Sequence, residues 1–199
     1  MATPLSAFDD RPRCWWPEGS SQADPIMVAY HDDEWGRPVH EDIALFERLC
    51  LEGFQAGLSW STILHKRDAF IRAFAGFVPE RVRAFDQADR ARLLADAGIV
   101  RNRAKIEATI GNAAAFMTLA AEFGSFDAYL AAQLPRPAPT LKREATRSKL
   151  PATTPESDAL SAELRRRGFR FVGSTIVYAF MQSVGLVDDH LSGCYLYRG

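Results

Sequence analysis

Apolar residues recur at helical spacing through most of the chain between Glu41 and Val184, and alternating strand patterns are almost absent. Glycine, proline and aspartate residues divide this stretch into segments as long as ordinary helices. The pattern argues against a sheet-based fold and predicts an all-α one. We expect helices at residues 41–55, 59–75, 79–85, 88–96, 103–123, 125–132, 156–167 and 171–184.

The chain of 199 residues is long enough for one domain with a substantial core, or for two small ones. We expect a single domain over residues 13–194, with a helical core at about 41–184 and terminal segments at 13–40 and 185–194. Residues 1–12 are polar and contain proline, which is typical of a disordered extension, and residues 195–199 form a tail. The proline-rich and basic stretch Leu134–Pro155 is typical of a linker between the central helices and the last two.

Composition is that of a soluble globular protein, with 47% hydrophobic and 25% charged residues. No apolar run reaches membrane-spanning length, and the first residues do not match a secretory leader, so we expect a cytoplasmic protein. Cysteines at positions 14, 50 and 194 do not form a secreted disulfide framework, which fits a reducing compartment.

The net charge of −1 argues against a protein that binds polyanions by bulk charge. Local basic clusters could still contact phosphate groups, and a solvated helix face is the alternative for each. The two clusters are Arg101, Arg103 and Lys105, and Arg165, Arg166, Arg167 and Arg170.

The densest group of chemically capable side chains lies in the segment Leu51–Trp60, which contains a carboxylate, an amide and two large aromatic rings. Glu52 falls inside the apolar pattern of the helix expected at 41–55. A carboxylate is costly to bury there unless it is hydrogen-bonded or paired, which at an apolar site indicates a ligand. The helix is expected to end near Gly57, and Ser59 is suited to cap the next one. The alternative is an ordinary helix corner at which Glu52 faces water.

Cysteine and histidine residues near the two ends of the chain form a second constellation. His190 and Cys194 are four residues apart, a spacing that places two ligands on one helical face or in one tight turn. Cys14 and His31 would complete a tetrahedral zinc site with no open position, which would tie the chain ends together. Because Cys14 and His31 are far apart in sequence, four unrelated residues remain the alternative.

A short turn containing Gly98 separates two apolar helical patterns and is followed by basic residues. This arrangement suits a helix-hairpin-helix, in which a helix N-terminus offers backbone amides to a DNA phosphate. A generic helical hairpin is the alternative. In the segment Gly168–Thr175, Gly173 allows a close approach, while the hydroxyls of Ser174 and Thr175 could cap the last helix or contact phosphate.

Taken together, five motifs resemble the 3-methyladenine DNA glycosylase I family from about Arg13 to Cys194. They are YHDDEWG at 30–36, LEGFQAGLSW at 51–60, DAGIVR at 96–101, RGFRFVG at 167–173, and Asp189-His190 with Cys194. The resemblance implies a helix-hairpin-helix glycosylase with a single catalytic domain and a structural zinc ion. It implies a monofunctional DNA repair enzyme, without a lyase step, that flips out and hydrolytically excises 3-methyladenine. Its partner would be double-stranded DNA of a bacterial nucleoid, and we expect a monomer.

The resemblance also implies roles for individual residues. Glu52 would be the catalytic carboxylate, accepting hydrogen bonds from the amine edge of the base and favouring its cationic form. Whether it acts as a base or by recognition and electrostatics alone stays open. The implied base-binding residues are Tyr30, Trp60, Trp16, Phe54 and Gln55; the DNA-backbone contacts are Gly98, Arg101, Arg103, Gly173 and Ser174; the zinc ligands are Cys14, His31, His190 and Cys194.

Two positions depart from the expected pattern. Met27 stands where some members of the family have a second pocket tyrosine, so a softer contact replaces a hydrogen bond. Lys105 follows the hairpin, but the family does not use it for covalent attack on the sugar, so we expect a phosphate contact or a surface residue.

Two other classes of function remain for comparison. A zinc-stapled DNA-binding module would find lesions without cutting and would have no need of Glu52. A zinc hydrolase would need an open coordination position, which two cysteines and two histidines do not leave.

Overall fold

The computed structural model describes residues 10–18, 24–134 and 150–198, and all the regular secondary structure in these ranges is helical. The predicted all-α class is confirmed. Most of the expected N-terminal extension and of the expected linker lies outside the described residues. The elements are α1 Trp15–Glu18, α2 Pro25–Asp33, α3 Asp42–Gln55, α4 Trp60–Leu64, α5 Arg67–Ala73, the 3-10 helix η1 Ala75–Phe77, α6 Pro79–Arg83, α7 Gln87–Ala95, α8 Arg103–Phe123, α9 Phe126–Gln133, α10 Pro155–Arg166 and α11 Ser174–Ser183.

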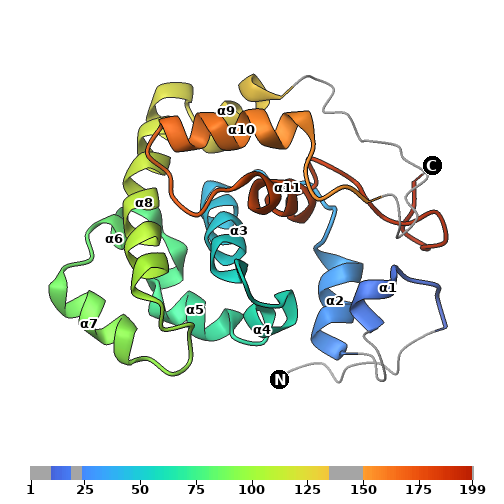
Figure 1. Cartoon of the computed structure of the whole chain (residues 1–199), viewed down its shortest axis with the longest axis horizontal. Helices are drawn as coiled ribbons and strands as arrows, with labels where there is room; N and C mark the ends of the chain where they lie inside the picture. Colours follow the sequence, from blue (N-terminus) through green and yellow to red (C-terminus); the bar gives the residue numbers. More distant parts are fainter. Residues whose placement is uncertain (1–9, 19–23, 135–149, 199) are drawn as a thin grey trace.

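Helix α3 lies at the centre of the molecule, between α8 on one side and α11 and α4 on others (Figure 1). Every residue from Arg48 to Phe54 is buried, so this helix has no solvent-facing stripe over its last two turns. The main core gathers around it, with Phe46 packed against Phe116 at a ring-centroid distance of 5.2 Å. A polar residue on this part of α3 therefore faces protein or a cavity, whichever side it is on.

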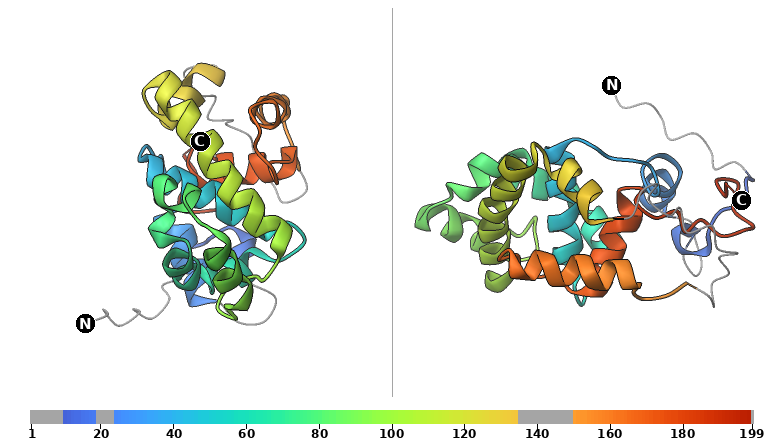
Figure 2. Two further views of the ribbon diagram at one scale, coloured as in Figure 1. Left: turned by 90° about the vertical axis from the view of Figure 1, so that its left-hand side faces the viewer. Right: turned by 90° about the horizontal axis from the view of Figure 1, so that it is seen from above.

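Helices α1 and α2 pack beside the C-terminal segment and form a second, smaller core (Figure 2). The two ends of the chain meet directly, because the backbone amide of Tyr195 donates to the carbonyl of Pro12 at 2.8 Å. The stretch after α2 is bound to the end of α11, where Gly36 N donates to the Gln182 carbonyl at 3.0 Å. At this junction Gly185 has a φ of +71°, and an added Cβ would lie 2.5 Å from the backbone of Arg37.

Several predicted boundaries need correction. Helices α1 and α2 were not predicted, although Asp24 caps α2 by accepting from the Ile26 amide at 3.1 Å and Pro25 occupies its first position. The helix predicted at 59–75 is divided into α4, α5 and part of η1. Helix α11 begins at Ser174 rather than at 171, because Phe171 has a φ of +56°. No helix in the described ranges is both long and apolar enough to cross a membrane.

Candidate active site and metal centre

A cavity of about 250 Å³ opens between α1, α2, α3, α4 and α11. It is smaller than the roughly 300–1,000 Å³ pockets of drug-sized ligands, which suits one flat ring system. Its walls are mostly aromatic and apolar, with one carboxylate and two amides. The lining residues are Trp15, Trp16, Met27, Tyr30, Trp35, Glu52, Gln55, Trp60, Leu150, Ala179 and Gln182. The structure thus brings together the expected Glu52, Tyr30, Trp60, Trp16 and Gln55.

Glu52 reaches the cavity from the buried part of α3 and is 3% exposed. Burial raises the pKa of its carboxyl to about 8, although the nearby Arg48 guanidinium opposes the rise. Its Oε2 atom is buried and has no hydrogen-bond partner among the described residues. The alternative in which Glu52 faces water at a helix corner is therefore wrong.

The side chains of Gln55 and Phe54 leave α3 in different directions. Gln55 follows Glu52 by three residues, so the two share a helix face and both line the cavity. Phe54 points the other way and packs in the core against Phe70, with ring centroids 4.6 Å apart. The prediction that Phe54 contacts the base is corrected, because two positions along a helix turn a side chain to the opposite side.

Tyr30 and Trp60 provide the aromatic wall beside Glu52. Their ring centroids are 5.2 Å apart, and Trp16 meets the Tyr30 ring edge-on at 6.2 Å. The Tyr30 hydroxyl and the Trp60 Nε1 atom are both buried without a hydrogen-bond partner in the described structure. Burial also raises the pKa of the Tyr30 phenol, and the charge on Glu52 adds to this effect. Three unpartnered polar groups around one cavity indicate a polar ligand, because buried polar atoms are nearly always hydrogen-bonded.

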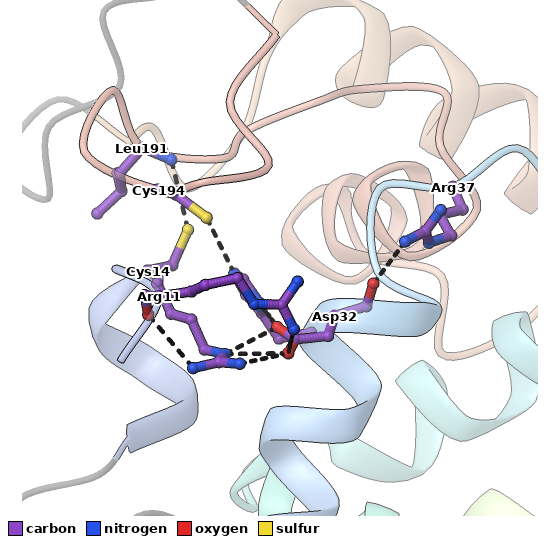
Figure 3. A network of polar contacts seen from close by, with 8 residues as sticks. Arg11, Cys14, Asp32, Arg37, Leu191 and Cys194 are labelled. Atoms are coloured by element: carbon purple, nitrogen blue, oxygen red, sulfur yellow. Dashed lines mark hydrogen bonds and ion pairs between the residues drawn. The ribbon is translucent and has the colours of Figure 1, made fainter. Parts of the chain in front are cut away.

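On the other side of α2, ligand atoms of Cys14, His31 and Cys194 all lie within 4.8 Å of one another. Figure 3 shows the two thiols facing each other between the N-terminal helix and the C-terminal segment. The Cys194 sulfur is 3.5 Å from His31 Nε2, about the separation of two ligands bonded to a tetrahedral zinc ion at about 2.0–2.3 Å. Burial raises the pKa of the Cys14 thiol to about 12, and burial lowers that of His31.

His190 adjoins this group, with its ring centroid 5.2 Å from that of His31. Its ring nitrogens are not among the ligand atoms that all lie within 4.8 Å of one another. Its Nε2 atom is buried and has no hydrogen-bond partner among the described residues. Its Nδ1 atom is 2.6 Å from Asp188, and His31 Nδ1 is 2.8 Å from Asp32. A carboxylate on Nδ1 leaves the lone pair of Nε2 available to a metal, as in many zinc sites. The donor set therefore fits zinc.

The network around Asp32 holds the N-terminal part of this group in place. Arg13 donates to both carboxylate oxygens of Asp32, with distances between 2.7 and 3.0 Å, while Arg37 donates to its backbone carbonyl at 2.6 Å (Figure 3). The carboxylate of Asp32 is thus engaged by both Arg13 and His31. Asp32 thus orients a candidate ligand rather than binding metal itself.

The hairpin predicted around Gly98 is present as α7, a turn and α8. Asp96 Oδ1 accepts from the Gly98 amide at 2.7 Å, and Asn102 caps α8 by accepting from the Lys105 amide at 3.1 Å. Arg101 and Arg103 are exposed at the turn. Lys66 donates to the Gly98 carbonyl at 3.1 Å, which ties the turn to the corner after α4, the helix that begins with Trp60.

Lys105 corrects another expectation, because it is neither a surface residue nor placed to contact phosphate. It is 6% exposed, and its Nζ atom donates to the carbonyls of Phe54 at 2.8 Å and Ala56 at 2.6 Å. Burial lowers the pKa of this amine. Lys105 therefore satisfies carbonyl groups at the C-terminal end of α3.

At the start of α11, Gly173 is the N-cap residue, and neither Ser174 nor Thr175 caps the helix through its side chain. The Ser174 hydroxyl instead hydrogen-bonds to Asp158, and it lies 3.0 Å from the Ser157 hydroxyl. An added Cβ at Gly173 would lie 3.4 Å from the Arg165 guanidinium. These contacts join α11 to α10 and leave the Ser174 hydroxyl already engaged.

Sequence patterns did not indicate several cavity residues. Gln182 and Ala179 come from α11, and Trp35 lies after α2, all far from Glu52 in sequence. Gln182 is oriented by Asp189, which accepts from its amide at 2.7 Å. Gly36 was quoted only as part of a motif, yet an added Cβ there would lie 2.8 Å from the His190 ring. No local signal reveals these neighbours, because the fold alone brings them together.

Comparison with known proteins shows similarity along nearly the whole chain. The family profile described as methyladenine glycosylase matches residues 20–197. DNA-3-methyladenine glycosylase 1 of Escherichia coli is 46% identical over 187 residues, or 94% of this chain and 97% of that protein. A crystal structure of a 3-methyladenine DNA glycosylase I has a TM-score of 0.83 at 43% identity, covering 93% of this chain and 99% of that one. A variant of such an enzyme in complex with 3-methyladenine has a TM-score of 0.82 at 32% identity, covering 92% and 97%.

Proposed function

Because the chain belongs to the methyladenine glycosylase family, we propose that it is a DNA repair enzyme that flips 3-methyladenine out of alkylated DNA and hydrolyses its N-glycosidic bond. The observation that carries the proposal is the buried carboxylate of Glu52 in an aromatic cavity the size of one base, because its Oε2 atom has no hydrogen-bond partner among the described residues. A base inside a duplex cannot reach such a cavity, so the nucleotide must leave the stack.

The chemistry of the substrate matches this cavity. Methylation at N3 makes adenine cationic and a good leaving group, so no strong acid is needed to expel it. Glu52 would accept from the amine edge of the base, and its negative charge would stabilise the cation in a water-poor site. Tyr30 and Trp60 offer ring faces and two polar atoms that have no hydrogen-bond partner among the described residues. Neutral adenine lacks the charge that this arrangement favours.

A lyase step is not part of the proposal. Covalent attack on the sugar requires a free amine, and Lys105, which follows the hairpin, already donates to two carbonyl groups of the chain. The enzyme would thus release the base and leave the sugar-phosphate backbone intact.

We infer that Cys14, His31, His190 and Cys194 hold one structural zinc ion, supported by their clustering and by the unpartnered Nε2 atom of His190. Four protein ligands leave no position for a reacting water, so the ion would stabilise the terminal segments rather than take part in hydrolysis.

For the DNA, we propose that the α7–α8 hairpin binds the backbone of a double strand through its turn and through Arg101 and Arg103. Gly173, at the start of α11, would approach the DNA backbone closely. Ser174 would lie beside the same phosphates, although its hydroxyl is already bonded to Asp158. We expect the enzyme to act as a monomer in the cytoplasm, where bacterial DNA lies.

The test is release of free base from N-methylated duplex DNA, with the product identified by chromatography. Wild-type protein should release 3-methyladenine, and Glu52→Gln should reduce the rate at least about a hundredfold, as expected when a charge-stabilising group is removed. Glu80→Gln, which alters an exposed carboxylate on α6, is the control and should match wild type. If both wild type and Glu52→Gln bind DNA equally and release no base, the chain is a lesion-binding module instead.

A further inference from the structure

Arg48 lies behind the cavity wall, one helical turn before Glu52 on α3. Arg48 is 5% exposed, and it does not line the cavity. Its Nη2 atom is paired with Glu34 at the end of α2, while its Nη1 atom is buried with no partner among the described residues. Its guanidinium carbon lies 5.1 Å from the centroid of the Tyr30 ring. A buried cation thus lies against the Tyr30 ring, which forms part of the cavity wall.

Arg48 is fixed from behind by a chain of ion pairs. Glu34 also accepts from Arg67 Nη1, with both oxygens at 2.8 Å, and Arg67 Nε donates to Glu47 at 2.6 Å. The network joins the C-cap of α2 to α3 and α5, and moving the Arg48 guanidinium would break its pair with Glu34 and its contact with the Tyr30 ring. Because residues four apart on a helix lie on one face, this fixed charge is beside Glu52.

The surroundings of Glu52 contain few other charges. Tyr30 of α2 is the titratable group that meets it across the cavity. From α4 the wall contains Trp60, and from α11 it contains Ala179 and Gln182, none of which titrates. Tyr178 on α11 hydrogen-bonds to Asp189. Among the described residues, Arg48 is therefore the cation placed to influence the charge on Glu52.

We propose that Arg48 is a positioning residue for base excision, whose clamped guanidinium holds the Tyr30 ring and keeps Glu52 able to carry a negative charge in the closed, apolar cavity. The inference rests on the proposed function for its catalytic meaning. Burial alone favours the neutral carboxyl, which cannot attract a cationic base, and a nearby cation offsets that penalty. Arg48 acts through Glu52 and Tyr30, without touching the base, and the apolar cavity still excludes water.

The decisive measurement is a carbon-13 NMR titration of the Glu52 carboxyl in the free, full-length protein, compared with the pH profile of base release. In wild type the pKa should be about 8. Arg48→Met should move the titration and the rising limb of activity to higher pH, and lower kcat/KM at pH 7 by about tenfold or more. Arg48→Lys, which keeps the charge, should restore most of the wild-type profile.

Two further variants keep the test decisive if Arg48→Met does not fold. Glu34→Gln removes the anion that partly neutralises Arg48, so the Glu52 titration should move to lower pH, the opposite direction. Arg90→Met removes an arginine on α7 that pairs with Glu107 outside this network, so it should leave the Glu52 titration and the activity profile in place. Unchanged titration of Glu52 in both Arg48→Met and Glu34→Gln would overturn the proposal. Because this titration needs no substrate, it decides the role of Arg48 even if no 3-methyladenine is released.

Discussion

At the scale of single residues, the charge proposed for Glu52 in function lowers the stability of the folded protein. Its pKa is about 8 in the folded protein and has an ordinary value near 4.5 in the unfolded chain, so the folded state binds one more proton between those values. Stability therefore falls as pH rises through this window, because the proton held by the folded protein is lost at the upper end. The ionised carboxylate on which the proposed mechanism depends is the form that burial disfavours.

This conflict predicts that Glu52→Gln stabilises the protein relative to wild type more at pH 8 than at pH 5. The neutral amide does not ionise, so it avoids a cost of roughly 3–5 kcal/mol that accumulates across the window. Urea unfolding at both pH values, with Glu80→Gln as the control, measures the difference. An equal difference between Glu52→Gln and wild type at pH 5 and pH 8 would contradict the assignment of the raised pKa to Glu52.

Gly36 is a second residue whose small size matters. It has a φ of +73°, and an added Cβ would lie 2.8 Å from His190 Cε1. We predict that Gly36→Ala displaces the His190 ring, lowers the retention of zinc and lowers Tm by several degrees. Gly193→Ala is a matched control beside Cys194, because an added Cβ there meets no atom within 4 Å. Zinc content after dialysis, with Tm on the same samples, is the measurement; full zinc retention in Gly36→Ala would refute the prediction.

At the scale of elements, the arginines at the hairpin turn differ from two arginines of the second basic cluster in their ion pairs. Arg101 and Arg103 are exposed at the hairpin turn and have no ion pair within the described part of the chain. By contrast, Arg166 and Arg167 both pair with Glu163. Phosphate contacts are therefore expected from the hairpin.

We predict that Arg101→Ala and Arg103→Ala each weaken binding to duplex DNA and reduce the slope of log K against log salt by about one, because each removes one phosphate contact. Arg166→Ala, which removes a charge already neutralised by Glu163, should leave the slope close to wild type. Fluorescence anisotropy over a range of salt concentrations gives these slopes. A loss of slope in Arg166→Ala, with none in the hairpin variants, would move the DNA surface to α10.

Most helices after residue 41 were predictable from sequence, including the short α6, α7 and α9, whereas α1 and α2 were not. The predictions for 41–55 and 103–123 agree with α3 and α8 to within one residue, because apolar periodicity is sustained there and Asn102 and Gly124 mark the ends of α8. Helix α1 has only one turn, and α2 has polar and apolar residues on several faces, so neither produces a clear period. Lys105 was misjudged because its partners, the carbonyls of Phe54 and Ala56, lie far away in the sequence, whereas helix periodicity alone could have placed Phe54 away from Glu52.

At the scale of the whole molecule, the candidate metal centre and the cavity share one structural support. Tyr30 and His31 are adjacent on α2, and the first lines the cavity while the second belongs to the metal group. Trp16, two residues after Cys14, is also in the cavity wall and lies 5.3 Å from the His31 ring. The smaller core around these residues contains few side chains besides them. Holding the chain ends together therefore also shapes one side of the cavity.

This coupling predicts the effect of removing zinc. Chelation, or Cys194→Ser, should release one zinc ion per chain, lower Tm and reduce base release, since the walls formed by Trp16 and Tyr30 lose their anchor. Hydrogen exchange should accelerate in residues 24–35 and 186–198, while α3 and α8, which pack in the separate main core, keep their protection. Cys50→Ser is the matched control, because Cys50 is buried in the main core away from the metal group. A zinc-free protein with unchanged Tm and unchanged exchange in the terminal segments would show that the ends are held by packing alone.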